Sequence, residues 1–285
     1  MDLQMLASIP SWEWSEKAGA VIRKALTDKK TPASERLVAA EMAGEATVMN
    51  DKMADILLSI LQDKSETNDI RCTAVISLGP ALEYADTMEF DDEEDLMISE
   101  PAYEKIQQTL RRLFMDSDVH EDIRRRILEA SVRAPQEWHR DAVRAAYMSD
   151  NENWRLTAVF CMSYIEGFEK QILESLDSKD PDMFYEAVCA SGNMGLEKAW
   201  PYITGIISSP DADNDLLLAA IDAVVNIRPE EAHDVLGHLV DHKDQDVVDA
   251  ACEALGIADA FLDAENDDDE EYNDDEDPFD DDDVK

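Results

Sequence analysis

Apolar residues recur three and four positions apart over most of the chain, which is the spacing of one face of an α-helix. One such segment holds Met53, Ile56, Leu57, Ile60 and Leu61, and residues 232–240 repeat the pattern near the other end. No stretch alternates polar and apolar residues for long, so no β-strand is expected. The pattern predicts an all-α protein.

A motif centred on a small residue recurs about every 30 residues and is clearest at residues 70–79. The seven aligned residues are Ala39, Ala74, Ile127, Ala158, Ala187, Ala220 and Ala251. Five positions further on stand Gly44, Gly79, Val132, Ser163, Gly192, Val225 and Gly256. A small side chain at a fixed helical position lets a neighbouring helix approach closely, and a glycine near a helix end favours a tight C-cap.

Each copy of the motif follows a second amphipathic segment, and a short polar turn separates the two. The turns cover residues 63–69, 116–118, 149–151 and 178–181 in four of the copies. Their Asp, Asn and Ser side chains are suited to capping the helix that follows. The repeating unit is therefore a helical hairpin, and the chain is predicted to be an α-solenoid of about seven hairpins.

These repeats resemble the HEAT repeats of bacterial proteins related to phycobiliprotein lyase subunits, over residues 12–261. The resemblance implies that the second helix of each hairpin lines the concave face. It also implies that an arginine or lysine early in that helix joins a ladder with turn aspartates. Arg36, Arg71, Arg124 and Arg155 match this position in the first four hairpins and are candidate partner-binding residues. Phe184, Leu217 and Val248 replace it in the last three, so the basic ladder is expected to stop midway.

Two acidic segments interrupt the repeats. An insert at about residues 85–99 separates the second and third hairpins and is predicted to be a loop. Residues 263–283 carry 15 acidic residues and no basic one. Such a segment buries too little apolar surface to offset its ordering entropy, so residues 263–285 are predicted to be a disordered tail after a solenoid domain of residues 1–262.

The net charge of -42 would repel nucleic acids and anionic membranes, and it favours a basic protein partner. Tyr272 and Phe279 are the aromatic residues of the acidic tail and are candidates to anchor such a partner. Residues 105–144 are a local exception, with nine basic and seven acidic residues. They are either a docking place for the insert, the tail or an acidic partner, or ordinary capping and ion-pairing arginines.

Apolar side chains near the starts of second helices give a further candidate surface, comprising Trp154, Phe184, Tyr185 and Leu217. They form either a concave patch for a partner helix or part of the core. Trp12 and Trp14 are expected to seal the first hairpin, because a terminal repeat must cover an exposed end.

Signals for catalysis, metals and cofactors are weak. The four cysteines fit neither a metal clip nor a disulfide framework, which indicates free thiols in the cytoplasm. His238 and His242 lie four residues apart, but no third ligand stands at a suitable spacing. His120 and Glu121 form the single His-Glu pair, whereas di-iron hydroxylases with HEAT repeats carry several. The N-terminus resembles no signal peptide, and no apolar run is long enough to cross a bilayer.

The expected function is therefore a non-catalytic scaffold, adaptor or assembly factor that needs no cofactor and presents a curved helical surface to a protein, with its acidic segments favouring a basic client. The alternative, implied by the resemblance, is a phycobiliprotein-lyase-like subunit that handles a bilin chromophore. Coloured adduct on co-expression with bilin and acceptor protein would distinguish the two. A DNA glycosylase of the HEAT type needs a basic groove and is disfavoured by the charge.

Overall fold

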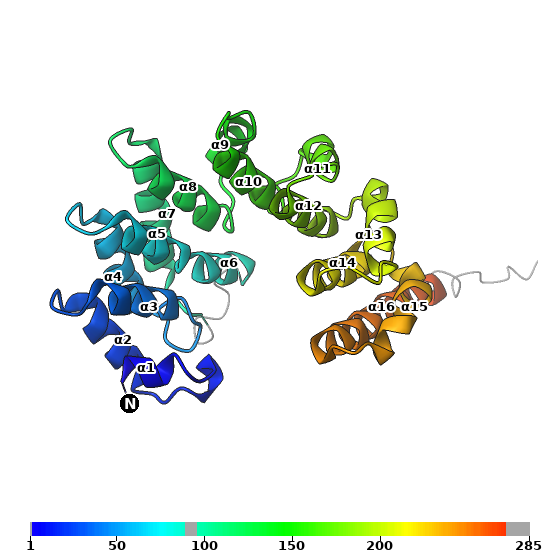
Figure 1. Cartoon of the computed structure of the whole chain (residues 1–285), viewed down its shortest axis with the longest axis horizontal. Coiled ribbons are helices and arrows are strands. Elements are labelled where there is room, and N and C mark those ends of the chain that lie inside the picture. The colour runs from blue at the N-terminus through cyan, green and yellow to red at the C-terminus, as the bar shows by residue number, and fades with distance from the viewer. Residues whose placement is uncertain (1, 89–95, 272–285) are drawn as a thin grey trace, which may run out of the picture. The chain divides into compact units, whose positions relative to one another are not determined.

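The computed structural model describes residues 2–88 and 96–271, without the side chains of residues 263–271. Within these ranges the regular elements are helices, and no strand occurs (Figure 1). The predicted all-α fold is confirmed. No helix of the described part has the length and apolarity needed to span a membrane.

The chain divides into two compact units, one up to Ile165 and one from Glu166 onward. The helices of the first unit are α1 (Leu3–Leu6), α2 (Ala18–Thr27), α3 (Ala33–Met42), α4 (Asp51–Gln62), α5 (Asn68–Ile76), α6 (Gly79–Thr87), α7 (Glu100–Met115), α8 (Glu121–Ser131), α9 (Glu137–Tyr147) and α10 (Glu152–Cys161). Those of the second are α11 (Glu169–Ser175), α12 (Pro181–Asn193), α13 (Trp200–Ile207), α14 (Asn214–Ile227), α15 (Ala232–Leu236) and α16 (Gln245–Glu271). Short 3-10 helices are η1 (Ser11–Glu13), η2 (Glu197–Ala199), η3 (Pro229–Glu231) and η4 (Gly237–Asp241).

These helices form the predicted hairpins. The first unit contains α2–α3, α4–α5, α7–α8 and α9–α10, and the second contains α11–α12, α13–α14 and α15–η4–α16. Within each unit the second helices pack side by side, α3 on α5, α5 on α8 and α8 on α10, then α12 on α14 and α14 on α16. Each unit is thus a stack of hairpins held together mainly through its second helices (Figure 1).

The repeated small residue marks the centre of this packing. All seven aligned residues, from Ala39 to Ala251, have 0% of their surface exposed. A single methyl group at most of these positions leaves room for the neighbouring helix backbone. The residues that align in the sequence are therefore the residues that are buried where the second helices pack.

Glycines five positions further on allow the neighbouring hairpin to approach closely, as Gly44 and Gly192 show. A Cβ on Gly44 would lie 3.0 Å from the Ser77 carbonyl oxygen, and one on Gly192 would lie 2.9 Å from Ala223 Cα. Gly256, in the last second helix, has no described atom within 4 Å of that point. The predicted tight C-caps are wrong, because positive φ angles occur at Gly167 and Gly195 instead. These glycines are required by the interhelical distance and not by a left-handed backbone.

Polar turn residues begin several second helices as predicted. The side chains of Thr67, Asn151 and Asp180 accept hydrogen bonds from the backbone N–H groups of Ile70, Asn153 and Asp182. These bonds satisfy N–H groups that the first turn of a helix leaves without a partner. At α8 the capping side chain is that of His120, outside the turn predicted at residues 116–118.

The start of the first unit is covered by α1, whose Leu3 and Leu6 are buried. Trp14 Nε1 donates to the carbonyl oxygens of Leu6 and Ile9 at 3.1 and 3.2 Å, as expected of a sealing residue. Trp12 is 79% exposed, so the same expectation is wrong for Trp12. A single indole N–H bound to two carbonyls holds the N-terminal segment in place.

Parts of the two acidic segments lie outside the described residues. Helix α6 continues to Thr87, residues 96–99 are non-helical, and residues 89–95 of the predicted loop lie outside the described residues. Helix α16 continues to Glu271, so the backbone is helical over the first nine residues of the segment predicted to be disordered. Alanine, leucine and glutamate near residue 264 favour such an extension. Residues 272–285 lie outside the described residues.

Two equivalent glycines test the role of close packing. Gly192→Ala should lower the free energy of unfolding by about 1–3 kcal/mol, because its new methyl group would overlap Ala223. Gly256→Ala should raise it by about 0.5–1 kcal/mol, since alanine is the better helix former and the space there is open. Urea unfolding followed by circular dichroism measures both. A shift in the same direction for both variants would contradict the packing argument.

Candidate partner-binding surface

Three of the four ladder arginines bind a backbone carbonyl ten residues earlier. The pairs are Arg36 with Leu26 at 3.4 Å, Arg71 with Leu61 at 2.8 Å and Arg124 with Phe114 at 2.8 Å. Each carbonyl lies in the last turn of the first helix, where no intrahelical donor remains. Arg155 instead donates to the Ser149 carbonyl oxygen at 3.1 Å. The guanidinium groups therefore join the two helices of their own hairpins.

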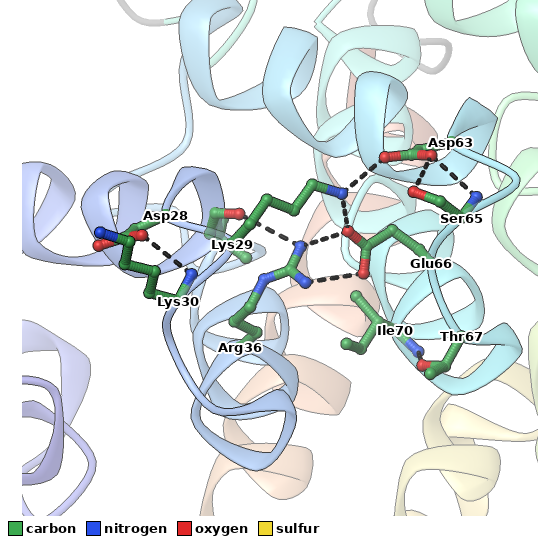
Figure 2. Close-up of polar contacts among 10 residues, drawn as sticks. Asp28, Lys29, Lys30, Arg36, Asp63, Ser65, Glu66, Thr67 and Ile70 are labelled. Carbon is green, nitrogen blue, oxygen red and sulfur yellow. Dashed lines mark hydrogen bonds and ion pairs between the residues drawn. The ribbon is translucent and has the colours of Figure 1, made fainter.

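Arg36 also pairs with a turn residue of the next hairpin (Figure 2). Its Nη1 and Nη2 lie 2.7 and 2.8 Å from the two carboxylate oxygens of Glu66, and both side chains are almost fully buried. Lys29 binds Asp63 at 2.7 Å and also contacts Glu66. Arg36, followed by the smaller effect of Lys29, holds the pKa of Glu66 below its ordinary value. The resulting network links the turns of the first two hairpins.

The expected ladder is thus shorter than its arginines suggest. Within the described residues, Arg71 and Arg124 form no ion pair with a turn carboxylate, and the partner of Arg36 is a glutamate. Arg36 and Arg71 are 6% and 7% exposed, which leaves them little surface for a partner. A partner-binding role for the four arginines stays a prediction.

Trp154 belongs to an aromatic cluster in the first unit. The Phe114 ring lies 4.9 Å from that of Trp138 and 6.4 Å from that of Trp154, measured between centroids. The Arg124 guanidinium lies 5.5 Å from the Phe114 centroid. Alanines of α9 and Trp154 line a pocket of about 340 Å³ beside this cluster. Such ring contacts stabilise the junction of two hairpins.

The other candidates for an apolar patch lie in the second unit. Leu217 is 4% exposed and belongs to the core, which is the second of the two interpretations of this group. Phe184 is half-buried, and Tyr185 is 37% exposed. Tyr185 is therefore the member of this group that is best placed to contact a partner. Tyr272 and Phe279 lie outside the described residues.

Many basic residues between Lys105 and Arg144 have partners within their own unit. Lys105 binds Asp55 at 2.7 Å, and Arg112 donates to Gln62 at 2.8 Å. On α8, Arg126 binds Glu129 at 2.6 Å. These contacts are the ordinary ion pairs and hydrogen bonds considered as one interpretation of this segment.

The second helices of the second unit form a different surface. No lysine, arginine or histidine occurs in the sequences of α12, α14 and α16. Six of their exposed acidic residues are Asp182 on α12, Asp215 and Asp222 on α14, and Asp246, Asp249 and Glu253 on α16; Asp259 on α16 is also exposed and pairs with His233. Within the described part of the chain, none of these six carboxylates takes part in an ion pair. We call these six residues, with Tyr185 and the half-buried Leu218, the acidic face.

Asp222 on α14 interacts electrostatically with groups on both neighbouring second helices, α12 and α16. Partial burial raises the pKa of Asp222, and the charge of Glu253 on α16 raises it further. Burial raises the pKa of the Cys189 thiol on α12 to about 11, with Asp222 among the charges that add to the effect. The carboxylates repel one another without a cation to offset them, so a positively charged group would be attracted to this face.

This surface is not evident from the sequence of any one of its helices. Asp222 and Glu253 are 31 residues apart, and each is an ordinary polar residue on an amphipathic helix. Their proximity follows from occupying the same repeat position, two residues after Ala220 and Ala251. The sequence feature that could have revealed this surface is the absence of basic residues from three successive second helices.

No protein-family model matches the chain, and no curated protein matches it significantly. Solved structures with a similar arrangement are helical-repeat proteins. The complex of CpcE and CpcF of phycocyanin lyase from Nostoc sp. PCC7120 is 15% identical, with a TM-score of 0.45 over 88% of this chain and 97% of that one. Human deoxyhypusine hydroxylase is 17% identical, with a TM-score of 0.40 over 90% and 88%. A designed armadillo repeat protein in complex with the peptide (KR)4 is 15% identical, with a TM-score of 0.31 over 86% and 100%. The likeness is one of fold alone.

The Arg36–Glu66 pair gives a test of how the first hairpins are joined. Arg36→Met should lower the free energy of unfolding by about 3 kcal/mol near pH 7, because it leaves a buried carboxylate without its main partner. The pKa of Glu66 is lowered in the folded state, so the pair stabilises above the ordinary value of 4.5 and loses this effect as the pH falls through the folded value. The deficit of Arg36→Met should therefore shrink in acid.

Urea unfolding at several pH values measures this effect. Arg155→Met is the matched control, since Arg155 is more exposed and lies 3.7 Å from Glu152. It should cost less than about 1 kcal/mol. If both variants lost the same free energy of unfolding at every pH, the ion pair with Glu66 would not contribute the expected stability.

Proposed function

We propose that this protein is a non-catalytic scaffold whose acidic face binds a basic segment of another protein. The observation that carries the proposal is the set of six exposed carboxylates on α12, α14 and α16, which have no cationic partner among the described residues. Adjacent carboxylates raise the free energy of the unbound face, and a basic ligand would relieve that repulsion.

The surroundings of the face support this choice of ligand. The second unit up to residue 262 holds 21 acidic and five basic residues. The basic residues of this unit lie outside its second helices, for example Lys170 on α11, which pairs with Glu174. A basic ligand approaching the second helices would therefore meet one sign of charge. A nucleic acid or an anionic membrane would be repelled.

Apolar groups within the acidic face favour a protein segment over a small cation. Tyr185 on α12 is 37% exposed, and Leu218 on α14 is half-buried. An amphipathic segment would place lysine or arginine against the carboxylates and an apolar side chain against these two residues. The aromatic ring and the charges together would give both affinity and orientation.

A titration with a defined peptide tests the proposal. The probe is a synthetic peptide of alternating lysine and arginine with one leucine, and isothermal titration calorimetry measures its Kd for the full chain. Asp222→Asn combined with Glu253→Gln should weaken binding about fivefold or more, because both charges lie at the centre of the face. Added salt should also weaken it.

The control is a double variant that removes the same number of negative charges elsewhere in the second unit. Glu169→Gln combined with Glu230→Gln removes two exposed carboxylates outside α12, α14 and α16. This pair should change the Kd by less than about twofold. Equal weakening by both double variants would show diffuse attraction to a negative chain, and no binding by the unmodified protein would reject the proposal.

The raised pKa of Asp222 on the acidic face also predicts how stability depends on pH. The pKa of Asp222 is raised in the folded state above 3.8, so its ionised form costs stability once the pH exceeds that value, and the cost is absent below it. Asp222→Asn should therefore raise the free energy of unfolding at pH 7 by up to about 0.5 kcal/mol and have no effect near pH 3. Thermal unfolding at the two pH values checks this, and a loss of stability at pH 7 would contradict it.

A further inference from the structure

The last second helix, α16, exposes positions that the other second helices bury. One residue after the aligned residue, the equivalent positions are Ala40, Val75, Leu128, Val159, Val188 and Ile221, and all are 0% exposed. Four residues after it they are Ala43, Leu78, Ser131, Met162, Ser191 and Val224, and all are at most 3% exposed. In α16 the same two positions hold Cys252, which is exposed, and Leu255, which is half-buried.

Gly256 completes this open surface. At the equivalent position, Gly44 lies against Ser77 at the end of α5, Gly192 lies against Ala223 on α14, and Gly79 lies against the Arg133 side chain. A Cβ on Gly256 would meet no described atom within 4 Å. We call Cys252, Leu255 and Gly256 the end face. Its geometry is that of an interhelical contact, with a glycine in the place where another helix backbone comes close.

The opposite end of the repeats is covered. Helix α1 packs on α2 with Leu6 fully buried, and Trp14 ties the preceding segment in place. Terminal repeats normally need such a cover, because the side of the last hairpin is otherwise apolar. At the α16 end, the exposed pair of His233 and Asp259 at 2.7 Å joins α15 to α16, while Cys252 and Gly256 are exposed.

We infer that the end face is a docking site for a helix of a partner protein, which continues the stack of second helices. Two of the three interior glycines at this position face a small residue, Ser77 at Gly44 and Ala223 at Gly192, whereas Gly79 faces the side chain of Arg133. By analogy with the contact of α12 with α14, the partner helix carries alanine, serine or glycine opposite Gly256. This surface is separate from the acidic face, and its assignment does not rest on the scaffold function proposed above.

The charge of the docking helix follows from the same stacking rule. Asp222 on α14 lies close enough to Glu253 on α16 for the charge of Glu253 to raise its pKa, and the two residues occupy the same repeat position. A helix added beyond α16 would place its own equivalent residue beside Glu253. Lysine or arginine is favoured there, whereas a second copy of this chain would bring its acidic α16 against another.

A peptide derived from α14 tests the assignment, because α14 already packs over a glycine in this way. The probe is a fluorescent peptide of residues 214–227 with the substitutions D215K and D222K. Its Kd for the full chain is measured by fluorescence anisotropy. Gly256→Leu should weaken binding about tenfold or more, because the added side chain blocks the close approach. The fold should be unaffected, since the site is open.

Gly205→Leu is the matched control. Gly205 lies on α13, is exposed and also has no described atom within 4 Å of an added Cβ. This variant has the same gain in helix propensity and should bind the peptide as the unmodified chain does. Equal binding by all three proteins, or no binding by the unmodified chain, would overturn the inference. So would a dimer, detected by sedimentation, that Gly256→Leu dissociates, because the occupant would then be a second copy.

Discussion

The close approach of successive second helices is the constraint on which the rest of the structure depends. Seven small or fully buried residues at one repeat position set the distance, and glycines five residues later bring the backbones nearer still. A single methyl group at such a contact is enough to force a neighbour to move. Because the helices are this close and in the same register, residues at equivalent positions become neighbours although they are about 30 residues apart in sequence.

This register explains why the two units differ electrostatically. In the first unit, arginines at one repeat position bind carbonyls at the ends of first helices, and Arg36 reaches a buried glutamate as well. The second unit has Phe184, Leu217 and Val248 at that position, so its second helices carry no such cations. Their carboxylates are then aligned by the stacking, and among the described residues no cation pairs with the six of the acidic face. A surface that lowers stability in this way is typical of a functional site.

Much of the fold could be predicted from the sequence because a repeat is a local pattern. The aligned residues, six alanines and Ile127, identified the core position of every hairpin, and the polar turns identified the caps of α5, α10 and α12. The predicted C-caps failed because a glycine near a helix end satisfies either a left-handed turn or a close contact, and the sequence does not distinguish them. The contact of Arg36 with Glu66 could not be predicted, because it depends on how the turns of two hairpins are placed relative to each other.

The candidate surface was harder to predict. Of the apolar and aromatic residues singled out in the sequence, Leu217 belongs to the core, Trp154 belongs to a cluster within one unit, and Tyr185 is exposed. Exposure at one helical position is set by the neighbouring hairpins, which a single segment does not reveal. Asp222 and Glu253 gain their significance from being adjacent, and an isolated acidic residue gives no sign of it.

The carboxyl titration of Asp222, followed by carbon-13 NMR of the full chain, tests this account most directly. Stacking of α14 on α16 predicts a pKa above 3.8, because the group is partly buried and lies beside Glu253. It also predicts that Glu253→Gln lowers this pKa part of the way toward the ordinary value. A pKa at or below 3.8 that does not respond to Glu253→Gln would contradict both the register of the helices and the acidic face built on it.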